Sequence, residues 1–221
     1  MVTNQPRLSK SFDTFIFDWD GTLTTVKLLR LINEKLNPVV KYYKWSSKRK
    51  RMSEIELHKA VLSKESIRSK SRELENRILS KPINFSMSFL TPRLHNGSRE
   101  VLEKLESKGK KIALLTNGNM YRIIKEMERL KVESYFEAIE SAQELGAWKP
   151  SPIGIEVLIR SLRSDKKKTL YIGDAADDIE TARFAGVKSC AIANGFDSIH
   201  NLESHSPDFL FKSMEVLYKA L

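Results

Sequence analysis

Short apolar runs along the chain alternate with segments in which apolar residues recur every three or four positions. The runs TFIFDWD at 14–20, KIALLT at 111–116 and KTLYIGD at 168–174 are apolar and end in polar residues. Runs of this length and composition are typical of buried strands. The same pattern predicts further strands, at 134–141, 187–193 and 208–211.

Helical periodicity fills the intervals between these strands in the second half of the chain. SREVLEKLESKG predicts a helix with Ser98 as its N-cap and with Gly109 just past its C-terminus. Further helices are predicted at 120–131, 153–162, 177–185 and 214–221. Apolar strands that alternate with helices form parallel sheets, so the sequence predicts an α/β core with a Rossmann-like parallel sheet.

A separate segment at 24–90 shows helical spacing from Val26 to about Ser80 and differs from the rest of the chain in charge. It holds 16 basic and 6 acidic residues, whereas the remainder holds 22 of each. The whole net charge of +10 therefore lies in this segment. We predict an α/β core formed by residues 1–23 and 91–221, and an all-helical domain inserted at 24–90.

Composition limits the class of protein. With 221 residues, 41% of them apolar and 30% charged, the chain is long enough for one domain with a core and a modest insertion. No run approaches the roughly 20 apolar residues of a membrane helix, and the N-terminus lacks an apolar signal core. The single cysteine, Cys190, fits a reducing compartment. We therefore expect a cytoplasmic monomer or homodimer that does not bind membranes.

Charged and polar residues gather where the predicted strands end. Asp18 and Asp20 close the first strand, Thr116 closes the second, and Asp174 follows a later one. Lys149 lies in a Trp-Lys-Pro-Ser-Pro loop before a predicted helix. Open parallel sheets bind ligands at the carboxyl ends of their strands, so we expect these groups to meet at one edge of the sheet.

Four motifs in a fixed order carry a resemblance to a known family. They are FDWDGTLT at 17–24, LLTNG at 114–118, KPSP at 149–152 and GDAADDIETARFAG at 173–186. With an insertion between the first two, the chain resembles the haloacid dehalogenase superfamily, in its phosphoglycolate-phosphatase-like branch with an α-helical cap. The resemblance implies a Mg²⁺-dependent phosphatase that hydrolyses small phosphate monoesters and uses the inserted domain as its cap.

The chemistry of the residues supports the same reading. On an extended strand Asp18 and Asp20 would present their side chains on one face. A carboxylate can attack phosphorus and form an aspartyl-phosphate, but repulsion between the two anions must be cancelled by a divalent metal and by Lys149. Asp18 and Asp174 offer the oxygen ligands that Mg²⁺ prefers. Thr116, with the amides of a helix start at Asn117 and Gly118, can bind phosphoryl oxygens alongside Lys149.

The resemblance adds finer roles to these positions. It makes Asp18 the nucleophile, and it gives the metal the backbone carbonyl of Asp20 as a further ligand. Asp178 supports the metal site through the GDxxxD spacing, while we expect Asp177 to be structural. Asp20 can protonate the leaving alkoxide and later deprotonate water. An acidic residue at this position marks hydrolases and mutases rather than dehalogenases or transport ATPases.

Several alternatives remain beside this interpretation. A receiver-type phosphoacceptor domain is rejected, because its aspartate lies in a middle strand and the domain is much shorter. A sugar phosphomutase stays open, since the residues next to its substrate would be the same. KYYKWSSKRKR at 41–51 interleaves aromatic and basic residues, which leaves open a phosphatase acting on nucleic-acid ends. We favour a cap helix with a solvated basic end, because no nucleic-acid motif accompanies the run.

The substrate itself is less constrained by the sequence. The basic cap either selects substrates with negative charge beyond the transferred phosphate or keeps the outer cap face soluble. After DGTLT the chain reads TVKLL, where many phosphoglycolate-phosphatase-like members have Asp-Ser. The sequence therefore does not identify phosphoglycolate as the substrate.

Overall fold

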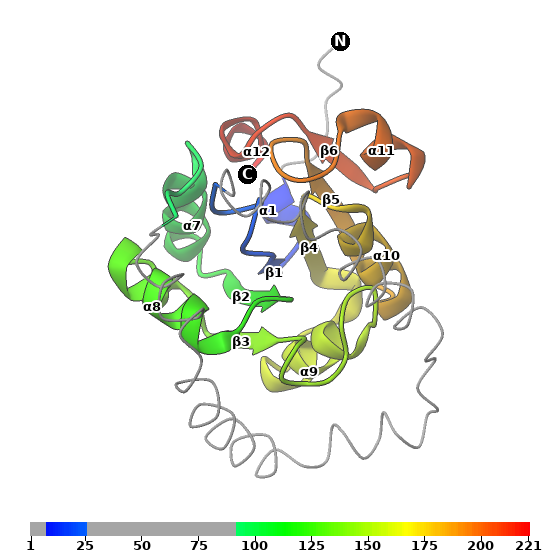
Figure 1. Ribbon diagram of the computed structural model, residues 1–221. Coiled ribbons are helices and arrows are strands. Elements are labelled where there is room, and N and C mark those ends of the chain that lie inside the picture. The colour runs from blue at the N-terminus through cyan, green and yellow to red at the C-terminus, as the bar shows by residue number, and fades with distance from the viewer. Residues whose placement is uncertain (1–7, 26–91) are drawn as a thin grey trace, which may run out of the picture.

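The structure is a computed structural model that describes residues 8–25 and 92–221 (Figure 1). Apart from its first two residues, the segment predicted as a helical insert at 24–90 lies outside the described residues, and so does the basic run at 41–51. The helical cap and the domain boundaries therefore stay predictions.

Six parallel strands form one sheet in the described part of the chain. They are β1 (Thr14–Phe17), β2 (Lys111–Thr116), β3 (Ala138–Ser141), β4 (Thr169–Gly173), β5 (Lys188–Ile192) and β6 (Phe209–Phe211). Their order is β3-β2-β1-β4-β5-β6, so the first strand of the chain lies in the middle of the sheet. This arrangement confirms the predicted α/β class with a Rossmann-like parallel sheet.

Helices cover both faces of this sheet (Figure 1). The described helices are α1 (Leu8–Ser11), α7 (Ser98–Ser107), α8 (Met120–Leu130), α9 (Ile153–Ser161), α10 (Ala176–Ala185), α11 (Ile199–Ser204) and α12 (Met214–Ala220), with short 3₁₀ turns η1 (Glu133–Tyr135) and η2 (Lys166–Lys168). α7, α8 and α12 pack on one face, and α9 and α10 pack on the other. None of these described helices has the length and apolar character needed to cross a membrane.

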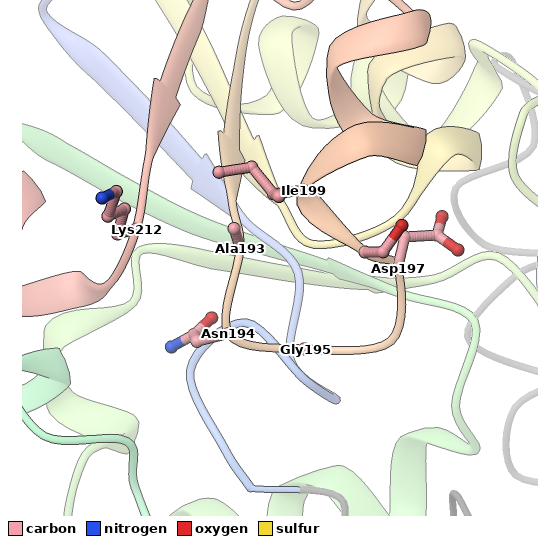
Figure 2. Close-up of a pocket in the computed structure, with 7 residues that line it drawn as sticks. Ala193, Asn194, Gly195, Asp197, Ile199 and Lys212 are labelled. Atoms are coloured by element: carbon pink, nitrogen blue, oxygen red, sulfur yellow. The ribbon is translucent and has the colours of Figure 1, made fainter.

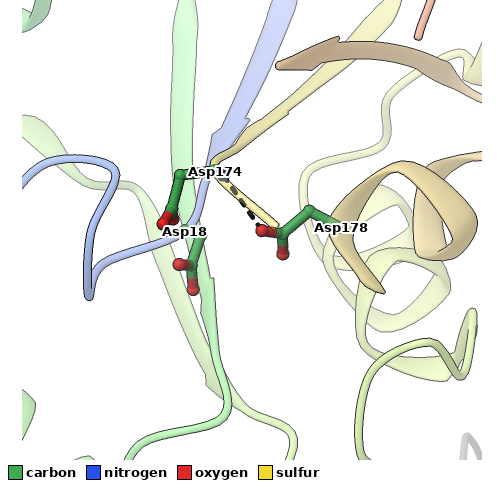
Figure 3. Close-up of side chains that lie close together, drawn as sticks. All are labelled: Asp18, Asp174 and Asp178. Carbon is green, nitrogen blue, oxygen red and sulfur yellow. Dashed lines mark hydrogen bonds between the residues drawn. The ribbon is translucent and has the colours of Figure 1, made fainter. Parts of the chain in front are cut away.

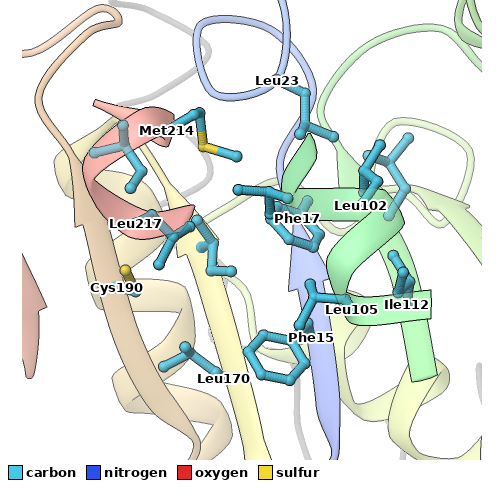
Figure 4. Packing of buried hydrophobic residues seen from close by; sticks show 14 of the residues in the cluster. Phe15, Phe17, Leu23, Leu102, Leu105, Ile112, Leu170, Cys190, Met214 and Leu217 are labelled. Carbon is cyan, nitrogen blue, oxygen red and sulfur yellow. The ribbon is translucent and has the colours of Figure 1, made fainter. Parts of the chain in front are cut away.

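The central strand β1 is buried on both of its faces. Phe15 and Phe17 point into the core layer that includes Leu105 of α7 and Leu217 of α12 (Figure 4). Ile16 points to the opposite face, into the layer formed with α9 and α10. A strand buried on both faces has a continuous apolar sequence rather than an alternating one, which is why this strand is recognisable in the sequence.

The chain turns immediately after β1, earlier than the sequence predicts. β1 ends at Phe17, and the carbonyl oxygen of Trp19 accepts hydrogen bonds from the amides of Leu23 and Thr24 at 3.2 and 3.1 Å. The amide of Gly21 donates to the carbonyl of Thr24 at 2.9 Å. The residues after Phe17 therefore form a tight loop, and the prediction that the extended strand continues through Asp18 and Asp20 is wrong.

Two further element boundaries differ from the predictions. The N-cap of α7 is Gly97 and not Ser98, whose hydroxyl donates instead to the carbonyl of Leu23 at 3.0 Å. Gly97 has a φ of 84°, a left-handed conformation that favours glycine. β3 begins at Ala138 rather than at residue 134, because the preceding Glu133–Tyr135 forms a 3₁₀ turn.

We expect Phe15→Ala to lower the free energy of unfolding by about 3–5 kcal/mol, because it leaves a cavity under the central strand. Phe15 is completely buried, and its ring packs edge-on against Phe12 with centroids 6.4 Å apart. Phe184→Ala is the matched control, since Phe184 is 59% exposed, and it should change stability by no more than about 0.5 kcal/mol. Urea denaturation measures both values, and equal losses for the two variants would contradict this account of the core.

Candidate active site

A cluster of three buried aspartates lies at the carboxyl edge of the two central strands (Figure 3). Asp18 follows β1, Asp174 follows β4, and Asp178 lies in the first turn of α10. Their exposed fractions are 6%, 0% and 3%. One carboxylate oxygen from each lies within 4.8 Å of the others. Because β1 and β4 are paired neighbours, the residues that follow them meet at one edge, as expected.

Lys149 joins this cluster from the loop before α9. Its Nζ lies 2.5 Å from Asp18 Oδ1 and 2.8 Å from Asp178 Oδ1, and its side chain is buried. The backbone amide of Lys149 donates to Asn117 Oδ1 at 3.1 Å. The loop after β2 therefore helps to fix the position of the lysine.

Burial and mutual repulsion control the ionisation of these groups. Burial raises the pKa of Asp18 to about 7, and the charges of Asp178 and Asp20 act in the same direction. Lys149 opposes this shift only in part. Burial, with the charges of Asp18 and Asp178, also raises the pKa of Asp174 well above its usual range. Burial disfavours the ammonium form of Lys149, but the two neighbouring carboxylates outweigh it and hold the pKa of Lys149 well above its usual value.

The cluster fits a divalent cation such as Mg²⁺. Among these described groups, three buried carboxylates face one ammonium group, which leaves an excess of two negative charges when all are ionised. Mg²⁺ prefers oxygen ligands and is commonly held by one or two carboxylates. Asp18 and Asp174 are the best placed to act as ligands, because the hydrogen-bonding capacity of Asp178 is taken up by other groups.

Asp178 is held by four hydrogen bonds. Its Oδ1 accepts from Lys149 Nζ and, at 2.9 Å, from the hydroxyl of Tyr171. Its Oδ2 accepts from the backbone amides of Asp174 and Ala175 at 3.1 and 3.0 Å. These contacts hold both the ammonium group of Lys149 and the turn after β4.

The carboxylate of Asp174 lies between two glycines that the sequence analysis did not single out. The hydroxyl of Thr22 donates to Oδ1 at 2.7 Å, and the amide of Phe196 donates to Oδ2 at 2.6 Å. A Cβ atom at Gly21 or Gly195 would lie 2.3 or 1.8 Å from Oδ2, so any larger residue at either position would displace the carboxylate. Gly21 also has a φ of 92°, which favours glycine independently.

A pocket of about 460 Å³ opens beside the loop that follows β5 (Figure 2). Its lining includes Ala193, Asn194, Gly195, Asp197, Ile199 and Lys212. Gly195 therefore borders both this pocket and the carboxylate of Asp174.

The residues expected to bind phosphoryl oxygens lie in and after the last position of β2. Thr116 is buried, and its hydroxyl oxygen accepts a hydrogen bond from the amide of Gly118 at 2.9 Å. The carbonyl of Gly118 accepts from the hydroxyl of Ser141 at 2.7 Å. Asn117 and Gly118 form a loop rather than the expected helix start, because the N-cap of α8 is Asn119.

Asp20 lies outside the three-aspartate cluster and pairs with α8 instead. Its Oδ1 and Oδ2 lie 3.0 and 2.5 Å from the two terminal nitrogens of Arg122. Arg122 also contacts Glu126, which accepts the indole N–H of Trp19 at 2.8 Å. Arg122 and Glu126 were not predicted as site residues from the sequence. Their only local signal is a pair of opposite charges four residues apart on a helix.

The chain is similar to known proteins over most of its length. A family model described as haloacid dehalogenase-like hydrolase matches residues 15–192. A phosphoglycolate phosphatase from Pseudomonas fluorescens is 26% identical over 124 residues, which are 56% of this chain and 46% of that protein. A pyrophosphatase, PpaX, from Halalkalibacterium halodurans is 24% identical over 203 residues, which are 91% of this chain and 93% of that protein.

One solved structure shares the fold over nearly the full length of both chains. It is the crystal structure of a predicted phosphoglycolate phosphatase from Haemophilus somnus, with a TM-score of 0.68 and 21% sequence identity. The similarity covers 95% of this chain and 97% of that one.

Among the curated relatives, several are matched over only about half of their length.

We expect the buried Asp18 carboxylate to make the stability of the metal-free protein fall as pH rises. Its pKa is about 7 in the folded protein and near 3.8 in the unfolded chain, so the folded state binds the extra proton between these values. For one such group the slope reaches about 1.4 kcal/mol per pH unit.

Asp18→Asn removes the ionisable group and should remove this part of the slope. Urea denaturation in excess chelator, at about pH 4.5 and about pH 7.5, compares the variant with the wild type across the window in which Asp18 loses its proton. The same pH dependence in both proteins would contradict a carboxyl group with a raised pKa at this position.

Proposed function

We propose that this chain, which belongs to the haloacid dehalogenase-like hydrolase family, is a Mg²⁺-dependent phosphatase of small phosphate monoesters. One observation carries the proposal. The Asp18 carboxylate is buried beside Asp174 and lies 2.5 Å from Lys149, at the carboxyl end of the central strand. The names of two matched relatives, phosphoglycolate phosphatase and pyrophosphatase, support a phosphorylated substrate.

Asp18 is the nucleophile in this proposal. Lys149 binds its Oδ1, so the other oxygen, Oδ2, attacks the phosphorus. The Oδ2–P bond forms while the bond from phosphorus to the ester oxygen breaks, and the electron pair leaves with that oxygen. The product is an aspartyl-phosphate, which divides one difficult displacement into two easier ones. Water then attacks phosphorus, inorganic phosphate leaves, and the Asp18 carboxylate is restored.

Positive charge must offset the repulsion between Asp18 and the phosphoryl group. Lys149 supplies one charge from a fixed position, because Asp18 and Asp178 hold its ammonium group on two sides. Mg²⁺ held by Asp18, Asp174 and the backbone carbonyl of Asp20 would supply the remainder as a Lewis acid. Thr22 and the amide of Phe196 hold the Asp174 carboxylate in place for this role.

The loop after β2 provides hydrogen-bond donors for the phosphoryl oxygens. The hydroxyl of Thr116 and the amide of Asn117 are the donors in this proposal, and the side chain of Asn117 is bound to the amide of Lys149. The amide of Gly118 already donates to the hydroxyl oxygen of Thr116, so its part is to orient that hydroxyl. Rigid donors of this kind stabilise the charge that builds up in the transition state. A hydrogen bond inside the loop, from Gly118 to Thr116, and one from Ser141 of β3 to Gly118 restrain this loop.

Asp20 is the proton donor and acceptor. It gives a proton to the leaving oxygen in the first step and takes one from the attacking water in the second. An assay of released inorganic phosphate over a panel of phosphorylated metabolites tests the activity. A sugar phosphomutase would instead return the phosphoryl group to a second hydroxyl of the sugar, and a phosphatase of nucleic-acid ends would release phosphate only from DNA or RNA.

We expect Asp18→Asn to reduce phosphate release below about 1% of the wild-type rate, because an amide does not attack phosphorus usefully. Asp13→Asn is the matched control: Asp13 adjoins the other end of β1, and its side chain is 63% exposed. It should leave the rate unchanged. Residual activity of several per cent in Asp18→Asn, after contamination is excluded, would rule out the covalent mechanism.

We expect a metal chelator to abolish phosphate release, and we expect added Mg²⁺ or Mn²⁺ to restore it. A second measurement does not depend on activity: Mg²⁺ should raise the melting temperature of the wild type, because it binds the folded state. Asp174→Asn should abolish this rise, since it removes a buried ligand. Full activity in excess chelator, or an unchanged rise in Asp174→Asn, would remove the metal or this ligand from the proposal.

A further inference from the structure

Helix α8 holds the two residues that follow Asp18. The guanidinium of Arg122 binds both oxygens of Asp20, at 3.0 and 2.5 Å. One of its terminal nitrogens also lies 3.0 Å from each oxygen of Glu126, one helical turn further along. Glu126 in turn accepts the indole N–H of Trp19 at 2.8 Å. We call Asp20, Arg122 and Glu126 the Arg122 triangle.

The Arg122 triangle is shielded from solvent. The exposed fractions of the side chains are 17% for Arg122, 19% for Asp20 and 5% for Glu126, and Trp19 is completely buried. A pair between two exposed charges contributes little, but a bidentate pair in a shielded position has a defined geometry. Lysine cannot reproduce that geometry, because its ammonium group is a single point charge.

The guanidinium also lies against the loop proposed to bind phosphoryl oxygens. A Cβ atom at Gly118 would be 2.4 Å from Nη2 of Arg122 and 3.1 Å from the hydroxyl oxygen of Thr116. Arg122 therefore fills the space between this loop and Asp20. Glycine at position 118 allows this close approach.

The charges of the triangle argue against Arg122 as a direct receptor for the substrate. Two ionised carboxylates surround one guanidinium, so the three described groups together carry a net charge of −1. An incoming phosphate or carboxylate would be repelled by both acids and would have to displace one of them. The geometry favours an action on Asp20.

We propose that Arg122 is a positioning residue that aims the Asp20 carboxylate, and that Glu126 and Trp19 hold Arg122 in place. The inference rests on the proposed function, in which Asp20 transfers protons in both steps. Proton transfer requires heavy atoms within about 2.6–3.2 Å, and a carboxylate on a loop meets that requirement only when its rotation is restricted. The two terminal nitrogens of Arg122 bind both oxygens of Asp20 and so restrict the rotation of this carboxylate.

The test variant is Arg122→Lys, which keeps the charge and removes the fork. With p-nitrophenyl phosphate the first step needs little help from an acid, whereas breakdown of the aspartyl-phosphate still needs Asp20. We expect a burst of nitrophenolate equal to the enzyme concentration, followed by a steady rate reduced about tenfold or more. With an alkyl phosphate, formation of the intermediate should become limiting and no phosphoenzyme should accumulate. Asp20→Asn should give the same signature.

A double-mutant cycle separates an action through Asp20 from any other role. If Arg122 acts only by aiming Asp20, Arg122→Lys should cause no further loss in the Asp20→Asn background. A merely structural role would instead lower the rates with both substrates in every background, in step with a loss of folded protein measured by circular dichroism. A direct role in binding substrate would raise KM and leave the single-turnover rate at saturation unchanged. Either result would overturn the inference.

Lys125→Gln is the matched control on the same helix, because Lys125 forms an exposed pair with Glu128 at 2.8 Å. It should leave both substrates unaffected. Wild-type protein that releases no phosphate and traps no phosphoenzyme would overturn the proposed function and the inference together. An active wild type in which Asp20→Asn shows the burst and Arg122→Lys does not would overturn the inference alone.

Discussion

The main constraint on the structure is the burial of three carboxyl groups beside one ammonium group at the edge of a parallel sheet. Asp18, Asp174 and Asp178 lie out of solvent with Lys149 as their described cationic partner. Removing charge from water is costly, and this cost is offset only where fixed donors surround each oxygen. The backbone amides after β4, the hydroxyls of Thr22 and Tyr171, and the amide of Phe196 are those donors. The buried apolar strands of the sheet fix the positions of these donors.

The sequence predicts the regular elements well, because their signals are local. β2 has the predicted bounds, and α8 and α10 begin and end within one residue of theirs. The predicted helix and strand boundaries are wrong where contacts with residues far away in the sequence determine the structure. Ser98 does not cap α7, because its hydroxyl is bound to Leu23, 75 residues earlier in the chain. The four-residue α1 is too short for a periodic pattern, and the sequence analysis gave no helix there.

The residues of the candidate site also form two groups, those that the sequence predicts and those that it does not. The four motifs that suggested the family contain Asp18, Lys149 and Asp174, and the match of the family model to residues 15–192 confirms that resemblance. Arg122 and Gly195 were missed, because each matters only through a partner far away in the sequence. The contacts of Arg122 with Asp20 and of Gly195 with Asp174 are visible only in the folded structure. The cytoplasmic location and the monomeric or homodimeric state stay predictions.

The residues that enclose the Asp174 carboxylate are far apart in the sequence and are therefore synthesised at different times. One wall of its carboxylate is formed by Gly21 and Thr22 near the start of the chain, and the other by Gly195 and Phe196 near its end. During synthesis on the ribosome, β1, β2 and β4 are all made before residue 196 leaves the exit tunnel. A growing chain therefore lacks the complete surroundings of the Asp174 carboxylate until residues 195 and 196 have emerged. A truncated product that ends before β5 would carry all four family motifs and still lack the residues of the second wall.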